Sequence, residues 1–212
     1  MTLAAFLSAG GIDALRACLR TEAPVLPLAP TRGDYDLNPT ARSLAPRTLV
    51  PAAVLLPIVA RAEPTLLLTL RSEELPHHAG QISFPGGRVQ DGDVTLAAAA
   101  LREMEEETGV TADFVSVAGF LDVYETGTGY AILPVVGLLR EGFSLKPDVR
   151  EVARVFEVPL AFLLDPANRQ EDVLKWKGGM RRVYAFQYET HYIWGATAAM
   201  LVNFAERLHD AS

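Results

Sequence analysis

The sequence has little of several features that mark common classes of protein. It contains one cysteine, Cys18, which excludes an internal disulfide and argues against a zinc site built from thiolates. We expect Cys18 to be a small apolar side chain buried on a helix. The four histidines, at positions 77, 78, 191 and 209, do not have the spacing of zinc ligands. Thiolate and imidazole metal sites are therefore not expected.

The chain also lacks an excess of positive charge. It has 19 Lys and Arg residues against 26 Asp and Glu residues, and a formal net charge of -7. Proteins that bind nucleic acid in general present a basic patch, so we expect no nucleic-acid partner. An acidic protein can still bind phosphates through local Arg residues, backbone amides, or a metal held by its own carboxylates.

No apolar run is long enough to cross a bilayer. The longest, from Leu49 to Ala60, is short and contains Pro51 and Pro57. The first residues show no charged segment followed by a cleavable apolar stretch, which a secretory signal would have. We therefore expect a cytoplasmic enzyme without a membrane partner.

What the chain does have is enough apolar sequence for one substantial core, since half of its 212 residues are hydrophobic. Residues 2–20 show apolar side chains at helical spacing, interrupted by Gly10-Gly11, and residues 21–47 carry five prolines of an extended connector. We predict a helical extension and connector in residues 1–34 and the main domain in 35–212. The extension either caps a substrate pocket or forms a dimer surface, so both a monomer and a homodimer stay open.

The remaining sequence alternates between strand-like and helix-like segments. Runs of branched and apolar residues predict strands at 52–60, 65–71, 114–124, 131–139, 152–158 and 183–188, the first two paired through a turn. Helical spacing predicts one helix from about Val94 to Thr108, ended by Gly109, and a last helix from about Trp194 to Leu208. Strands outnumber helices, which indicates an α/β or α+β domain with a mixed sheet and helices on both faces.

The helix before Gly109 contradicts the rules of its own local structure. Glu103, Glu106 and Glu107 stand at i, i+3 and i+4 and share one face, while Glu105 points away. The apolar positions Val94, Ala97, Leu101 and Met104 are predicted on the other side. Like charges repel each other, and the helix dipole disfavours anions in its last turns. A divalent cation would convert this repulsion into shared coordination.

Two neighbouring features fit such a site. Arg102 lies one turn from Glu106 and is placed to orient that carboxylate. The segment Phe84-Pro85-Gly86-Gly87 predicts a turn whose paired glycines let the backbone approach a phosphate or a metal closely. Asp91 and Asp93 are expected to cap the start of the helix.

These residues resemble the Nudix box, a pattern of Gly, five residues, Glu, seven residues and Arg-Glu-U-x-Glu-Glu-x-Gly-U, where U is a bulky aliphatic residue. The matching residues are Gly87, Asp93, Arg102, Glu103, Glu106, Glu107 and Gly109. Two departures affect the first half: Asp93 replaces the Glu, and eight residues separate it from Arg102.

The resemblance implies an α/β/α sandwich that hydrolyses a nucleoside diphosphate linked to another group. It implies Mg²⁺, with Mn²⁺ as an alternative, held by Glu103, Glu106, Glu107 and the backbone of Gly87. Glu103 is our first choice for orienting or deprotonating the attacking water. A further metal ligand is expected from Glu125 or Glu151.

A second stretch is similar to the signature of coenzyme A pyrophosphatases, which implies cleavage of coenzyme A into 3′,5′-ADP and 4′-phosphopantetheine. It comprises residues 67–72, Gly80 and residues 84–87, and the similarity extends to residues 151–160 and 192–197. Pro76 stands where this signature has an Arg, and His77 or His78 is a substitute donor. We expect Arg71, Gly86, Gly87 and Arg88 to bind the substrate, and Trp194, Tyr124 and Tyr130 either to stack on adenine or to belong to the core.

Two other functions compete with this interpretation. A Nudix enzyme acting on ADP-ribose or dinucleoside polyphosphates would keep the chemistry, and the missing Arg at Pro76 favours it. A nucleotide-binding module without turnover would keep only the fold. The intact run from Arg102 to Gly109 argues against the module, because binding alone does not need three carboxylates on one helical stripe.

Overall fold

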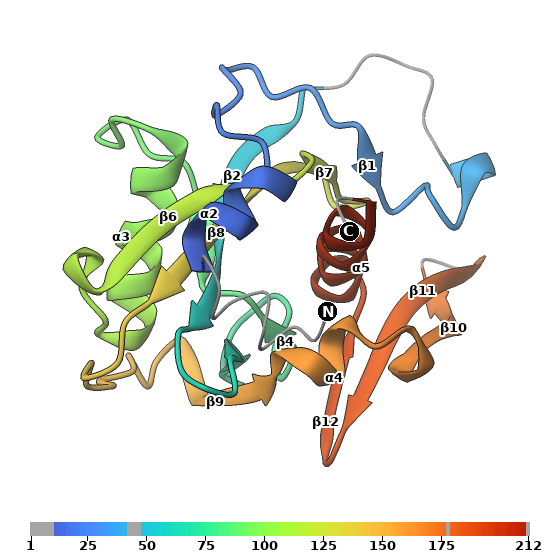
Figure 1. Ribbon diagram of the computed structural model, residues 1–212. Coiled ribbons are helices and arrows are strands. Elements are labelled where there is room, and N and C mark those ends of the chain that lie inside the picture. Colours follow the sequence, from blue (N-terminus) through green and yellow to red (C-terminus); the bar gives the residue numbers. More distant parts are fainter. Residues whose placement is uncertain (1–10, 42–47, 177–178, 211–212) are drawn as a thin grey trace.

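A computed structural model describes residues 11–41, 48–176 and 179–210 (Figure 1). The helices are α2 (Gly11–Cys18), α3 (Leu96–Thr108), α4 (Leu160–Leu164) and α5 (Ala196–Asp210), and the 3-10 helices are η1 (Pro39–Ala41), η2 (Ala112–Phe114) and η3 (Pro166–Asn168). The strands are β1 (Arg32–Gly33), β2 (Val50–Val59), β3 (Thr65–Arg71), β4 (Ile82–Ser83), β5 (Gly86–Arg88), β6 (Val115–Phe120), β7 (Tyr124–Glu125), β8 (Tyr130–Leu139), β9 (Val152–Pro159), β10 (Arg169–Trp176), β11 (Gly179–Tyr188) and β12 (His191–Trp194).

The larger sheet is mixed, as the sequence predicts. Strand β2 runs parallel to β8 along its whole length and antiparallel to β3 at Ile58↔Leu66 and Val59↔Thr65. The other side of β3 pairs antiparallel with β9, and β5 pairs with the first half of β2. The expected pairing of the first two long strands is therefore confirmed, although β8 and β9 are their more extensive partners.

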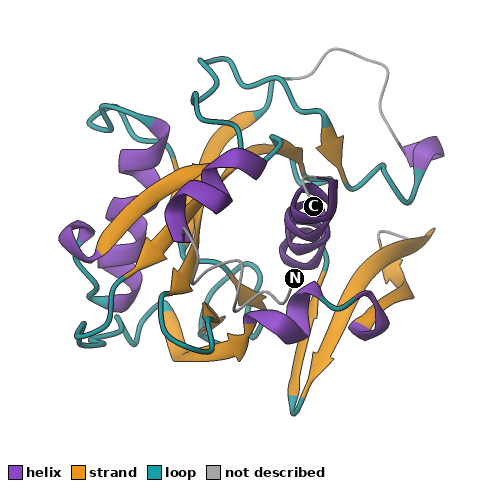
Figure 2. Cartoon of the chain, in the orientation of Figure 1, coloured by secondary structure: helices purple, strands orange, loops and turns teal. Residues whose placement is uncertain are grey.

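Helices cover both faces of this sheet (Figure 2). Alternate side chains of β2 point to opposite faces: Leu56 and Ile58 pack with residues of α2, α4 and α5, whereas Leu55 and Val59 pack against α3. Two hydrophobic cores therefore lie back to back across one layer of strands, and the expected α/β/α sandwich with helices on both faces is confirmed.

Helix α3 ends where the sequence predicts and begins later. Gly109 adopts a left-handed conformation with a φ of 76°, and its N–H bonds to the carbonyl of Glu105. At the other end the hydroxyl of Thr95 accepts a bond from the N–H of Ala98, so Thr95 is the cap. The expectation that Asp91 and Asp93 cap this helix is wrong, and Val94 lies before it with 88% of its surface exposed.

The N-terminal segment packs onto the same body. The predicted helix in residues 2–10 lies outside the described residues, but α2 buries Leu15 and Cys18 beside α5, which confirms the expected burial of Cys18. The connector then crosses the edge of the sheet, where β1 pairs in parallel with β7.

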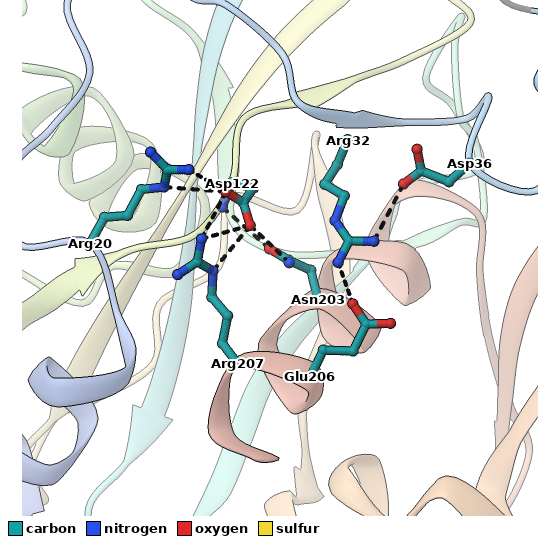
Figure 3. Close-up of polar contacts among 7 residues, drawn as sticks. All are labelled: Arg20, Arg32, Asp36, Asp122, Asn203, Glu206 and Arg207. Carbon is teal, nitrogen blue, oxygen red and sulfur yellow. Dashed lines mark hydrogen bonds and ion pairs between the residues drawn. The ribbon is translucent and has the colours of Figure 1, made fainter. Parts of the chain in front are cut away.

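A group of ion pairs fastens this segment in place (Figure 3). The carboxylate of Asp122, just after β6, accepts hydrogen bonds from Arg20, Asn203 and Arg207. Nearby, Arg32 of β1 pairs with Glu206 of α5 and with Asp36. Segments from both halves of the chain therefore meet at one place, and we call the residues Arg20, Asp122, Asn203 and Arg207 the Asp122 cluster.

A second, three-stranded sheet of β10, β11 and β12 was predicted only in part. The sequence indicated a strand at 183–188, which is the second half of β11, and a helix from Trp194, which instead ends β12. This sheet precedes α5, which packs against β11 and β12. None of the described helices is long and apolar enough to span a membrane.

Candidate active site

The carboxylates of α3 do not all face solvent. Glu107 is buried, with 3% of its surface exposed, and shares its side of the helix with the buried residues Ala100 and Met104. The expectation that the acidic and apolar stripes lie on opposite sides is therefore wrong at this position. Burying a carboxylate is costly, so the burial of Glu107 makes it a candidate functional residue.

Strand β5 lies over the carboxylates. A side chain at Gly87 would bring its Cβ to 2.4 Å from the carboxyl carbon of Glu103, and one at Gly86 would meet the carbonyl oxygen of Ala53 at 2.6 Å. The backbone of Gly86 lies close enough to the carboxylate of Glu107 to lower the pKa of that group. The backbone therefore approaches the carboxylates closely, whereas its approach to a phosphate or a metal stays a prediction. These glycines belong to a strand and not to the expected turn.

Arg102 connects the first half of the motif to the acidic helix. Its guanidinium binds both oxygens of Asp93, at 2.9 and 3.0 Å, and donates to the carbonyl of Arg88. The same side chain donates to Glu103 at 2.7 Å and to Glu106 at 2.9 Å. Asp93 thus anchors Arg102, a role the sequence did not indicate, and Arg102 orients two carboxylates instead of the expected one.

Two residues from outside the helix complete the group. Nη1 of Arg71, at the end of β3, lies 3.8 Å from Oε1 of Glu107. The N–H of Ser72 bonds to the carbonyl of Glu151 at 2.8 Å, which holds the start of β9 beside the end of β3. Glu151 is close enough to influence the charge of both Glu103 and Glu107.

Burial and mutual repulsion dominate the electrostatics. Burial raises the pKa of Glu107 to about 8, with Glu103 and Glu151 adding repulsion, against the opposing charge of Arg71. Burial also raises the pKa of Glu103, although its bonds to Arg102 oppose the shift. A positive charge between these carboxylates would reverse both causes, because it supplies the missing counter-charge.

The residues present fit a divalent cation. The Oε2 atom of Glu107 is buried and has no hydrogen-bond partner among the described residues, and it belongs to a carboxylate that lies close to Glu103 and Glu151. Within the described part of the chain, no three acidic, His or Cys side chains already converge closely enough to enclose an ion. Glu103 and Glu106 both bond to Arg102, and Glu106 is the more exposed of these two expected ligands.

The other residues expected to bind the substrate differ in their contacts and in their exposure. Arg71 has a buried Nε without a partner among the described residues, and about a quarter of its side chain is exposed. Arg88 extends from β5 to the hydroxyl of Tyr130, with Nη2 at 2.6 Å. Nδ1 of His78 donates to Oε1 of Gln81, and Pro76 and His77 are exposed.

Three further candidates lie elsewhere. Tyr124 is buried and bonds to Asp34, so its core assignment is confirmed and it has no free face for adenine. Trp194 closes the smaller sheet, at its pairing with Ala185. Glu125 lies on β7, which β8 separates from β2. Of the two expected extra ligands, the structure therefore brings only Glu151 to the acidic helix.

Comparison with known proteins agrees with this geometry. Residues 49–177 match the family described as the NUDIX domain. The chain is 43% identical over 157 residues, 74% of its length and 84% of the relative's, to an uncharacterized Nudix hydrolase NudL from Photorhabdus laumondii. It is also 43% identical to a protein of the same description from Escherichia coli O1:K1, over 73% of this chain and 80% of that one.

Solved structures support the fold. The crystal structure of a MutT protein from Methanosarcina mazei aligns with a TM-score of 0.51 at 23% identity, covering 78% of this chain and 96% of that one.

Proposed function

The chain belongs to the Nudix hydrolase family, and we propose that its site hydrolyses the pyrophosphate bond of coenzyme A to 3′,5′-ADP and 4′-phosphopantetheine. Acylated and oxidised forms of coenzyme A would fit the same chemistry. The observation that carries the proposal is the buried carboxylate of Glu107, which faces Arg71 and lies under the glycines of β5.

The proposed roles follow from these contacts. Glu103, Glu107 and Glu106 would hold the metal together with the backbone of Gly87, and Glu103 would orient the attacking water. Arg102 would keep the carboxylates of Glu103 and Glu106 in place through its anchor on Asp93. When bound, Mg²⁺ or Mn²⁺ would neutralise the diphosphate and lower the pKa of the attacking water.

The choice of coenzyme A rests on the segment from Leu67 to Gly87. In the structure this segment supplies β3, which ends at Arg71, and β5, which carries Gly86 and Gly87 over the acidic helix. Both ends of the signature therefore meet at the proposed reaction centre. Arg71 and Arg88 are the proposed contacts for the phosphates. The guanidinium of Arg71 lies beside Glu107, and the backbone carbonyl of Arg88 accepts a bond from Arg102.

Product analysis tests the proposal. The purified protein is incubated with Mg²⁺ and, separately, with coenzyme A, ADP-ribose and diadenosine polyphosphates, and products are separated by chromatography. Release of 3′,5′-ADP and 4′-phosphopantetheine, with the other substrates nearly intact, is the expected result. The exposed variant Glu105→Gln serves as a matched control for Glu107→Gln, which should release at least about 100-fold less product.

The second candidate is a Nudix enzyme for ADP-ribose or dinucleoside polyphosphates. It is favoured by Pro76, which is exposed and offers no cation where the coenzyme A signature has an Arg. Preferential cleavage of one of these substrates would keep the metal chemistry and reject coenzyme A. An absence of cleavage with every substrate would instead support a nucleotide-binding module.

A further inference from the structure

Strand β10 forms an open edge of the three-stranded sheet. Its inner side pairs with β11 from Arg169↔Phe186 to Trp176↔Gly179, and its outer side pairs with no other strand in the described part of the chain. None of residues 169–175 is buried, so the described elements leave this edge accessible. An open edge presents unpaired backbone N–H and C=O groups, which can pair with a strand of another chain.

One face of β10 carries an apolar residue between two opposite charges. Because side chains alternate along a strand, Glu171, Val173 and Lys175 point to the same side of the sheet. All three are exposed, Val173 by 55%. Met180 of β11, which pairs with Lys175, is 69% exposed and extends the apolar surface.

Symmetry limits how this edge can pair with its own copy. In a closed two-fold dimer the two strands run antiparallel, and residues that face each other point to the same side of the sheet. Neighbours in a strand point to opposite sides, so a residue cannot pair with its own neighbour in the second copy. The two-fold axis must therefore pass through a position where one residue faces the same residue of the other copy. Two such registers pair almost the whole strand: one centred on Asp172, which pairs residues 169–175, and one centred on Val173, which pairs residues 170–176.

The charges discriminate between these two registers. Centring on Asp172 places this carboxylate against its own copy and places Arg169 opposite Lys175 twice, so every charged pair repels. Centring on Val173 places Glu171 opposite Lys175 of the second copy, twice, around a contact between the two valines. We propose that β10 pairs antiparallel with β10 of a second copy, centred on Val173, to form one continuous sheet across a dimer.

Charged residues on an edge strand often serve to prevent pairing. Here they would oppose the register centred on Asp172 and favour the one centred on Val173, which is how a self-complementary interface becomes specific. Glu171 also pairs with Arg182 of the adjacent strand, which holds its carboxylate on this face. Neither Glu171 nor Lys175 belongs to the proposed catalytic group, so the interface can be altered separately from hydrolysis.

The test is a charge-reversal experiment followed by analytical ultracentrifugation over a range of concentrations. The wild type should show a monomer–dimer equilibrium. Glu171→Lys and Lys175→Glu each turn two attractive pairs into two repulsive ones, and each should raise the dimer dissociation constant at least about tenfold. An equal mixture of the two variants should dimerise again, because every position then faces its opposite charge. Glu63→Lys, at an exposed turn, is the control and should change nothing.

Two results would overturn the proposal. The first is a wild type that stays monomeric at every concentration up to its solubility limit. The second is a dimer that persists in both single variants with no preference for mixed dimers, which would locate the interface elsewhere. Circular dichroism and coenzyme A hydrolysis, measured on each variant, identify any protein that has failed to fold.

Discussion

At the scale of single residues, the surroundings of Glu107 disfavour the ionised form of its carboxyl group. Its carboxylate is buried near two other acidic groups, and the guanidinium of Arg71 is 3.8 Å away. A pKa of about 8 means that a large fraction of the metal-free protein keeps this carboxyl protonated at neutral pH. Binding of a divalent cation should therefore release a proton from this site.

Replacing Glu107 tests its role in hydrolysis separately from its effect on the stability of the fold. We expect Glu107→Gln to lower Mg²⁺-dependent hydrolysis by at least about 100-fold, because it removes a negative charge from the proposed metal site. The same change should leave the metal-free protein equally stable or more stable, since a neutral amide is less costly to bury than a carboxylate. Glu105→Gln is the control, and both proteins are compared by kinetics and thermal unfolding. Unchanged hydrolysis would reject the metal assignment.

The raised pKa also predicts how stability depends on pH. Between pH 4.5 and 8 the folded protein keeps a proton on Glu107 that the unfolded chain has lost, so this group favours folding most at low pH. Its contribution to the free energy of unfolding should fall as pH rises through this window and level off above pH 8. Thermal unfolding in EDTA would measure this, with Glu107→Gln as the baseline lacking the effect.

Added Mg²⁺ should act in the opposite direction. It binds the ionised carboxylate, so the rise in melting temperature on adding Mg²⁺ should be larger at pH 8 than at pH 5.5. An equal rise at both values would mean that Glu107 does not bind the metal.

At the scale of elements, α3 shows what the sequence could and could not predict. Gly109 fixed the end of the helix in advance, because a left-handed residue there leaves few alternatives. The start was misplaced because two aspartates precede Thr95 and are equally good caps in isolation. Asp93 is instead recruited by Arg102, a contact across nine positions of chain that only the folded loop creates.

The cap of α3 gives a direct test. We expect Thr95→Ala to lower the free energy of unfolding by about 1 kcal/mol, because it removes the acceptor for the N–H of Ala98. Thr95→Ser keeps the hydroxyl and should restore most of the loss. Urea denaturation measures both, and an alanine variant as stable as the wild type would show that the cap contributes little.

The strands, too, include some that the sequence predicts and one that it does not. Strands β2, β3, β8 and β9 were predicted because they are buried on at least one face and read as apolar runs. Strand β10 was missed because exposed and charged residues occupy both of its faces, so no period of two appears. Glu151, which the sequence offered as an alternative to Glu125, is brought toward the acidic helix by the pairing of β9 with β3.

At the scale of the whole molecule, the Asp122 cluster joins segments that are distant in sequence. Asp122 is 12% exposed and binds Arg20, from beyond α2, and Arg207, near the end of α5 (Figure 3). These bonds hold the pKa of Asp122 below its usual value despite the opposing effect of burial. The cluster therefore stabilises the fold at neutral pH, and this contribution is lost as pH falls through the pKa of the folded state.

Removing this carboxylate should loosen both segments. We expect Asp122→Ala to lower the free energy of unfolding by about 2 kcal/mol, less than for a fully buried pair because Arg20 is half exposed. Asp113→Ala is the matched control, since its pair with Arg140 is exposed on both sides, and it should leave the stability nearly unchanged. Chemical denaturation compares the two, and equal losses would contradict the special place of Asp122.

The two cores that lie back to back across the central strands also have a consequence for synthesis. The core that faces α3 is built from residues between Leu28 and Val155, whereas the opposite core also needs residues of α5 as far as Leu208. On the ribosome the first core can close while the second still exposes Leu56, Ile58 and Leu68. A nascent chain would therefore have one face of the sheet covered by α3 and the other face still exposing apolar residues. We expect the protein to depend most on a chaperone until α5 has been synthesised and covers that second face.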